Sequence, residues 1–238
     1  MAKVYNIEKM MKNSFLCCVL SLTVLLSGCV VESHKTVVSQ PSNEQNYAKS
    51  EIVNSTDRVT GSYRGEFLAL GIGQSESLIN SIKSNNNDAI NSVLSHPNDF
   101  IPPVLFALAD QVMEMNEPRA AMFWYYTAQL RARSDANKSL DPTVSNGLNE
   151  LNRYYGLKIG RYAKEHIAEL TEIMERVIEY DKISDRMYNP KWVAVLGDEA
   201  YTKEVISFVS KEEFKAIDDS TREGFYRGFL NAIRKQTN

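Results

Sequence analysis

The strongest constraint on the fold is a helical hairpin in the middle of the sequence. Asp99 and two prolines at 102–103 are suited to begin a helix. Asn116-Glu117-Pro118 is typical of a turn, and a second helix is predicted over 119–133. Apolar residues of the first helix recur at helical spacing, at Val104, Leu105, Leu108, Val112 and Met113. Two helices joined by so short a turn must lie antiparallel and share an apolar face.

The segments on either side of the hairpin also have helical patterns. Short helices are predicted over 75–84 and 88–95, with Asp88 as the cap of the second. Asp141-Pro142-Thr143 begins a helix that runs to about Tyr155. A long amphipathic helix is predicted from Ile159 to Val177, with lysine, glutamate and arginine on its opposite side.

The C-terminal quarter is expected to contain one short extended piece, over 193–197, and a final helix. Capping boxes are predicted at 210–213 and at 220–223, because each has a serine three residues before a glutamate. The final helix is expected to bury Phe225, Phe229, Leu230 and Ile233. Taken together, residues 61–238 are predicted to form an all-α domain, an antiparallel helical array or bundle.

The N-terminal region has the pattern of a secretory signal peptide. Residues 14–26 are thirteen uncharged, mostly apolar residues that follow Lys9 and Lys12. Thirteen helical residues rise only about 20 Å, which is short of the ~30 Å hydrocarbon core of a bilayer. We therefore expect a cleaved leader over 1–28 rather than a permanent span. Met10 or Met11 is the expected translation start.

The end of this leader resembles the lipobox of bacterial lipoproteins, in the residues Leu26-Ser27-Gly28-Cys29. The resemblance implies cleavage by signal peptidase II between Gly28 and Cys29, and covalent diacylglycerol and N-acyl lipid on Cys29. An ordinary signal peptide, in which Cys29 has no role, is the alternative. In enterobacterial lipoproteins an aspartate after the lipidated cysteine favours the inner membrane, so Val30 implies the periplasmic face of the outer membrane if the source is Gram-negative.

Residues 29–60 are predicted to be a flexible tether between the lipid and the helical domain. Their composition, rich in serine, asparagine, glutamine and threonine, offers too little apolar surface for a core. Removal of residues 1–28 takes away three lysines and one glutamate, so the net charge changes from −3 to −5. An acidic chain of this kind is a poor candidate for binding nucleic acid.

The second helix of the central hairpin resembles the second helix of a Sel1-type or tetratricopeptide-like repeat. The residues that carry the resemblance run from Ala121 to Ala128 and include Trp124 and Tyr125. Such repeats stack into helical arrays that bind proteins, but one copy also fits an unrelated helical bundle, and stacked repeats generally need three or more units. In either case Trp124 and Tyr125 are expected in the core.

A search of the sequence for metal or phosphate chemistry yields weak candidates. His166 and Glu169 are three residues apart and share a predicted helix face, but no second such pair accompanies them. Gly71-Ile72-Gly73-Gln74-Ser75 lacks the lysine and third glycine of a phosphate loop, and indicates a flexible entry to a helix. We expect no metal and no cofactor.

The charged candidates for catalysis or ligand binding have plain alternatives as well. Asp110, Glu114 and Glu117 are expected to serve solubility and partner steering rather than a paired-carboxylate active site. Basic residues near the end of the second hairpin helix offer contacts to an anionic surface, or favourable charges at a helix C-terminus; they are Arg131, Arg133 and Lys138. No nucleophile motif occurs, and no thiol remains after lipidation. We expect no catalytic residues.

These features predict a membrane-anchored, non-catalytic protein-binding module of the cell envelope. Sel1-like lipoproteins recur among immunity proteins, so the resemblance implies an immunity lipoprotein that neutralises an antibacterial effector of a contact-dependent (type VI) secretion system. A chaperone or assembly factor of an envelope complex is the alternative within the same class. A cell-wall or lipid hydrolase is the alternative of a different class, and it requires an acid and a base that the sequence does not display.

Overall fold

The computed structural model describes residues 63–70 and 72–237, and these residues form a helical fold. Within them the one pairing of extended backbone is an isolated bridge between Ser139 and Phe208. The predicted all-α class is therefore confirmed. The α-helices are α3 (Ile72–Lys83), α4 (Asn87–Ser95), α5 (Pro102–Glu114), α6 (Pro118–Ala136), α7 (Val144–Glu165), α8 (Ile167–Ile183), α9 (Glu199–Thr202) and α10 (Phe214–Thr237). The 3₁₀-helices are η1 (Gly65–Leu70), η2 (Pro97–Asp99), η3 (Pro190–Leu196) and η4 (Lys211–Glu213).

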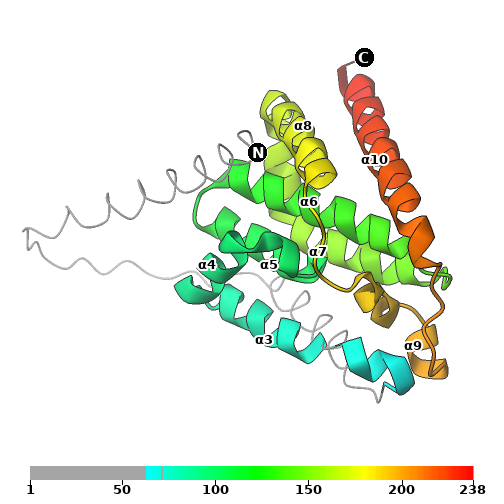
Figure 1. The fold of residues 1–238 in the computed structure, drawn as a ribbon. Coiled ribbons are helices and arrows are strands. Elements are labelled where there is room, and N and C mark those ends of the chain that lie inside the picture. The colour runs from blue at the N-terminus through cyan, green and yellow to red at the C-terminus, as the bar shows by residue number, and fades with distance from the viewer. Residues whose placement is uncertain (1–62, 71, 238) are drawn as a thin grey trace, which may run out of the picture. The chain divides into compact units, whose positions relative to one another are not determined.

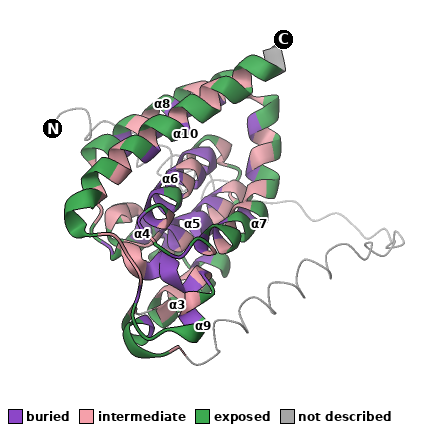
Figure 2. Cartoon of the chain, turned by 90° about the vertical axis from the view of Figure 1, so that its right-hand side faces the viewer, coloured by how far each residue is buried: buried purple, intermediate pink, exposed green. Residues whose placement is uncertain are grey.

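Helices α5 and α6 form the centre of the array (Figure 1). Helix α6 packs against α5, α7, α8 and α10, and α5 also packs against α3 and α7. Figure 2 shows the buried residues gathered on α5 and α6, whereas α8 and α10 are partly exposed along their length. The core therefore surrounds the hairpin that the sequence indicates most strongly.

The α5–α6 hairpin forms as predicted, with one difference at its start. Pro102 and Pro118 each occupy the first turn of a helix, where a missing backbone N–H costs nothing. Asn116 makes the turn between them with a φ of 61°, a conformation that asparagine tolerates better than most residues. The cap of α5 is Ile101, without a side-chain hydrogen bond, so the prediction of Asp99 as its cap is wrong.

The preceding pair, α3 and α4, has boundaries close to the predicted ones. Helix α3 begins at Ile72, three residues earlier than expected, and includes Gly73. The cap of α4 is Asn86, whose Oδ1 accepts a hydrogen bond from the N–H of Ala89 at 3.0 Å. The prediction of Asp88 in this role is therefore wrong, because Asp88 is already inside the first helical turn.

Helices α7 and α8 divide the chain differently from the sequence prediction. The helix predicted to end near Tyr155 continues to Glu165, and the long helix predicted from Ile159 to Val177 is broken at His166. At His166 φ is −127° and ψ is 54°, which lies outside the helical region. The apolar spacing continues across this residue, so periodicity alone does not reveal the break.

The segment between α8 and α10 is helical where an extended piece was expected. Residues 193–197 belong mostly to η3, so that prediction is wrong. The capping box of Ser210 and Glu213 is confirmed, with both reciprocal hydrogen bonds present at the start of η4. The one predicted at 220–223 is wrong, because these residues lie inside α10, where the Oγ of Ser220 donates to the carbonyl of Ile217 at 3.1 Å.

Helix α10 buries less apolar surface than predicted. Of its side chains that the structure describes, Thr221 and Phe225 are buried, at 6% and 7% exposure. Phe229, Leu230 and Ile233 are half-buried, so the expected apolar anchor of this helix is incomplete. Polar contacts therefore contribute to the attachment of α10 to the rest of the fold.

Candidate functional site

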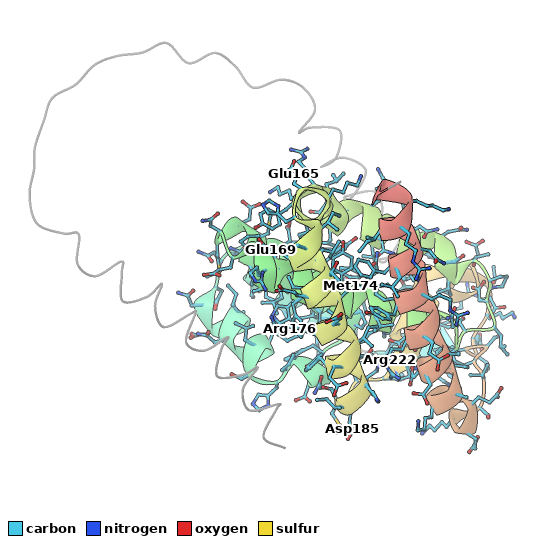
Figure 3. All side chains as sticks on the ribbon, turned by 90° about the horizontal axis from the view of Figure 1, so that it is seen from above. Glu165, Glu169, Met174, Arg176, Asp185 and Arg222 are labelled. Carbon is cyan, nitrogen blue, oxygen red and sulfur yellow. The ribbon has the colours of Figure 1, made fainter. Side chains whose placement is uncertain are left out.

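The candidate site is a charged pocket where the C-terminal end of α8 meets the first turns of α10. Its volume is about 420 Å³. Figure 3 shows Arg222 between α8 and α10, and Asp185 just beyond the end of α8. Charged residues dominate the lining, which comprises Asp135, Lys138, Asp181, Lys182, Ser184, Asp185, Arg186, Tyr188, Pro190, Lys211, Phe214, Lys215, Asp218, Asp219 and Arg222. We refer to it as the α8–α10 pocket.

Asp181 is the centre of the ion network that forms the floor of this pocket. Its side chain is fully buried and contacts three guanidinium groups. The Nη2 of Arg186 lies 2.9 and 3.0 Å from the two carboxylate oxygens, and the Nε of Arg222 lies 3.0 Å from Oδ2. The Nε of Arg131 lies 3.3 Å from Oδ1. Burial alone would raise the pKa of Asp181, but Arg186, Arg131 and Arg222 hold that pKa below its ordinary value.

Arg131 lies behind the pocket floor and is fully buried. Besides its contact with Asp181, its Nη2 donates to the Oδ1 of Asn98 at 2.8 Å, and its guanidinium lies 5.2 Å from the ring centre of Tyr180. The Tyr180 hydroxyl donates to the same oxygen of Asn98. Arg131 therefore connects α6, α8 and η2 by charge and hydrogen bonding.

Asp135, one turn further along α6, is the second buried carboxylate. The indole Nε1 of Trp192 donates to its Oδ2 at 2.9 Å, and the Nζ of Lys138 lies 3.2 Å from Oδ1. Burial raises the pKa of Asp135, and the nearby cations Lys138 and Arg186 oppose that rise. The hydroxyl of Tyr188 is buried without a hydrogen-bond partner in good geometry among the described residues, while burial and then the charge of Asp135 raise its pKa.

Asp218 connects α10 to this network. Its Oδ1 accepts from the Oγ of Ser134 and lies 2.7 Å from both the Nζ of Lys138 and the Nη1 of Arg186. On the next turn of α10, Thr221 accepts a hydrogen bond from Asn137 at 2.9 Å. These contacts attach α10 to α6 where its apolar packing is sparse.

The structure corrects the sequence interpretation of the basic residues in the last turns of α6 and just beyond its end. Arg131 and Lys138 are buried and paired with carboxylates, so neither is available to bind an anionic surface. Arg133 is exposed, and its guanidinium lies 5.3 Å from the ring centre of Phe225 on α10. Sequence reasoning missed the network as a whole, although Arg131 and Asp135 lie four residues apart on one face of α6 and Lys138 follows two residues after the end of that helix.

The predicted metal candidates His166 and Glu169 do not come together as a metal site. The Nδ1 of His166 lies 2.9 Å from the carbonyl of Tyr162, and its ring stacks on that tyrosine with 3.8 Å between centres. Glu169 instead pairs with Arg119 at 3.2 Å. Across residues 63–70 and 72–237, no group of three histidine, cysteine, aspartate or glutamate side chains is placed to hold a metal. Gly73 lies inside α3, and Gly71 is outside the described residues.

The acidic candidates at the end of α5 do not form a carboxylate pair either. Glu114 forms an ion pair with Lys158 of α7. Burial raises the pKa of Asp110, and Lys158 opposes the rise. A smaller hollow of about 390 Å³ lies beside this ion pair, with Arg161 and Tyr162 of α7 in its wall. Glu117 is the residue before α6, and its side chain does not cap that helix.

The other predicted residues divide between the core and the part of the chain outside the described range. Trp124 and Tyr125 are 2% and 6% exposed, so their predicted place in the core is confirmed. Gly28, Cys29 and the tether lie outside the described residues. In the part that is described, no helix is both long and apolar enough to cross a membrane.

Comparison with known proteins adds no further assignment. No protein-family model, no curated protein and no solved structure matches this chain. The resemblances to the lipobox and to a Sel1-type helix therefore stay predictions from the sequence.

Proposed function

We propose that this protein is a lipid-anchored periplasmic module of the outer membrane that binds another protein and catalyses no reaction. Within that class we favour an immunity protein that neutralises a secreted antibacterial effector. The observation that carries the proposal is the mutual pairing of the charges in the α8–α10 pocket. Asp181 contacts three guanidiniums, and Asp218 contacts a lysine and an arginine.

The ion pairing of these side chains supports a role in protein binding more than a role in proton transfer. A general acid or base must exchange a proton with a substrate, and its pKa must lie near the working pH. The guanidiniums around Asp181 keep it ionised far below neutral pH, and Lys138 and Arg186 hold Asp218 in place. A hollow lined by paired charges on a helical array instead offers a surface that selects a partner by shape and charge.

The proposal is tested by deleting the gene and competing the deletion strain against its parent on a surface. We expect the parent to kill the deletion strain, and a plasmid copy of the gene to restore survival. We also expect the purified full-length protein to form a complex with the product of a neighbouring toxin gene. Equal survival together with no complex would contradict the immunity role. A loss of one envelope complex in the deletion strain, without killing, would favour the assembly-factor alternative.

The proposed lipid anchor on Cys29 is tested by a separate prediction. The variant Cys29→Ala should move the protein from the membrane fraction to the soluble fraction, because two or three acyl chains, at about 0.8 kcal/mol per buried methylene, would be lost. The measurement is fractionation of the envelope followed by intact-mass analysis of the processed chain. Cys18→Ala is the matched control, since Cys18 belongs to the predicted leader and its loss should leave the distribution unchanged. A Cys29→Ala protein that stays in the membrane fraction would contradict lipidation.

A further inference from the structure

The rim of the α8–α10 pocket holds two cations that form no ion pair with a described residue. Lys182 at the end of α8 and Lys211 at the start of η4 both line the pocket and are both exposed. Neither forms an ion pair with any residue in 63–70 or 72–237. The lining contains six basic and five acidic side chains, so the pocket has an excess of one positive charge in a chain whose net charge is −3. The local charge is therefore opposite to that of the protein.

Arg222 adds an oriented donor to these two exposed lysines. Its Nε donates to Asp181 and its Nη1 to Asp219, at 3.0 and 2.8 Å, which holds the guanidinium plane in one orientation. Its Nη2 donates to no described residue, and this atom is not buried. The side chain is 13% exposed and lines the pocket. A guanidinium that is already oriented loses little conformational entropy when it binds a ligand.

The same residues favour an anion over a cation as the ligand. Four of the five acidic side chains already contact a basic group; they are Asp135, Asp181, Asp218 and Asp219. A metal ion would have to displace these ammonium and guanidinium groups. An anion, in contrast, would meet Lys182, Lys211 and the free Nη2 of Arg222 without breaking any ion pair.

We propose that the α8–α10 pocket receives a carboxylate side chain, an aspartate or glutamate, presented by the protein partner. This inference rests on the proposed function. A single carboxylate matches the excess of one positive charge, whereas a phosphate group brings close to two negative charges. The volume of about 420 Å³ accommodates a glutamate side chain with the backbone on either side of it. The guanidinium of Arg222 and a carboxylate are also a well-matched hydrogen-bonding pair.

The test is a nuclear magnetic resonance titration of the full-length lipidated protein in non-ionic detergent micelles, observed at the arginine Nε–H signals. The probes are the peptide acetyl-Gly-Glu-Gly-amide, its Gln counterpart, and inorganic phosphate, at low ionic strength, where surface charges are least screened. We expect the Glu peptide to shift the Arg222 signal saturably and the Gln peptide to leave it unchanged. Equal shifts from both peptides, or tighter binding of phosphate than of the Glu peptide, would overturn the proposal.

Paired variants separate the pocket from general charge effects. The double variant Lys182→Gln/Lys211→Gln should weaken binding of the Glu peptide about fivefold or more, because each lost ammonium contributes a modest electrostatic term. The control Lys164→Gln/Lys235→Gln removes the same charge from exposed lysines that do not line the pocket, and should leave the affinity unchanged. Equal affinities for both double variants would overturn the assignment. A toxin complex that forms normally with the pocket variant would refute this inference and leave the proposed function intact.

Discussion

The variant Asp181→Ala is expected to lose about 3–5 kcal/mol of its free energy of unfolding at neutral pH. The aspartate is fully buried, and its removal leaves the equally buried Arg131 without its carboxylate. Since whole domains are stable by about 5–15 kcal/mol, the loss is a large fraction of the total. Urea denaturation followed by circular dichroism measures it. Asp185→Ala is the control, because Asp185 is exposed and forms no ion pair among the described residues.

The pH dependence of the stability difference between the wild type and Asp181→Ala tests whether the ionised carboxylate is the cause. The pKa of Asp181 is lower in the folded protein than its ordinary value near 4, so its stabilising contribution is present above that value and is lost as the pH falls through the folded pKa. Asp135 has a raised pKa and acts in the opposite direction. The wild type should therefore lose its advantage over Asp181→Ala below about pH 4. A difference in stability below 1 kcal/mol at pH 7, or one that persists undiminished at pH 2, would contradict the network as described.

The second large effect is expected for Phe106→Ala, in the centre of α5. Phe106 is fully buried, stacks on Tyr155 of α7 at 5.6 Å and meets Tyr125 of α6 edge-on at 5.5 Å. Truncation removes both ring contacts and opens a cavity where three helices meet, so we expect a loss of about 3–5 kcal/mol. Differential scanning calorimetry at neutral pH provides the measurement.

The matched control for Phe106→Ala is Leu157→Ala. Leu157 lies on α7 close to Tyr155 in sequence but is 68% exposed, so its truncation should change stability by less than about 0.5 kcal/mol. Similar losses for both variants would mean that Phe106 does not occupy the central position described here.

The hairpin was predictable because its signals are local. Pro102 and Pro118 indicate where its helices begin, and the apolar spacing from Val104 to Val112 defines the face that packs. Each signal lies within a few residues of the feature that it determines. The break at His166 has no such signal, since residues 161–165 directly before it contain neither proline nor glycine and the apolar spacing continues beyond it.

The charged pocket was not predictable because its residues are far apart in the sequence. Its carboxylates at 135, 181 and 218 lie in α6, α8 and α10, and only the packing of these helices brings them together. A charged residue on a predicted helix is usually solvated, so Arg131 and Lys138 looked like surface residues. Ala128, three residues before Arg131 and on the same face of α6, is apolar and buried, and it was the one available indication that Arg131 is buried.

The dependence of α10 on Asp218 has a consequence for how the chain completes its fold during synthesis. The ribosome makes α6 and α8 first, and Lys138 and Arg186 then await a carboxylate that is more than thirty residues downstream of the second of them. Until Asp218 emerges, the nascent polar interior contains more cations than anions. The final helix therefore brings both Asp218 and Arg222 to this network, and a ribosome that stops before it would release a product that lacks the third carboxylate.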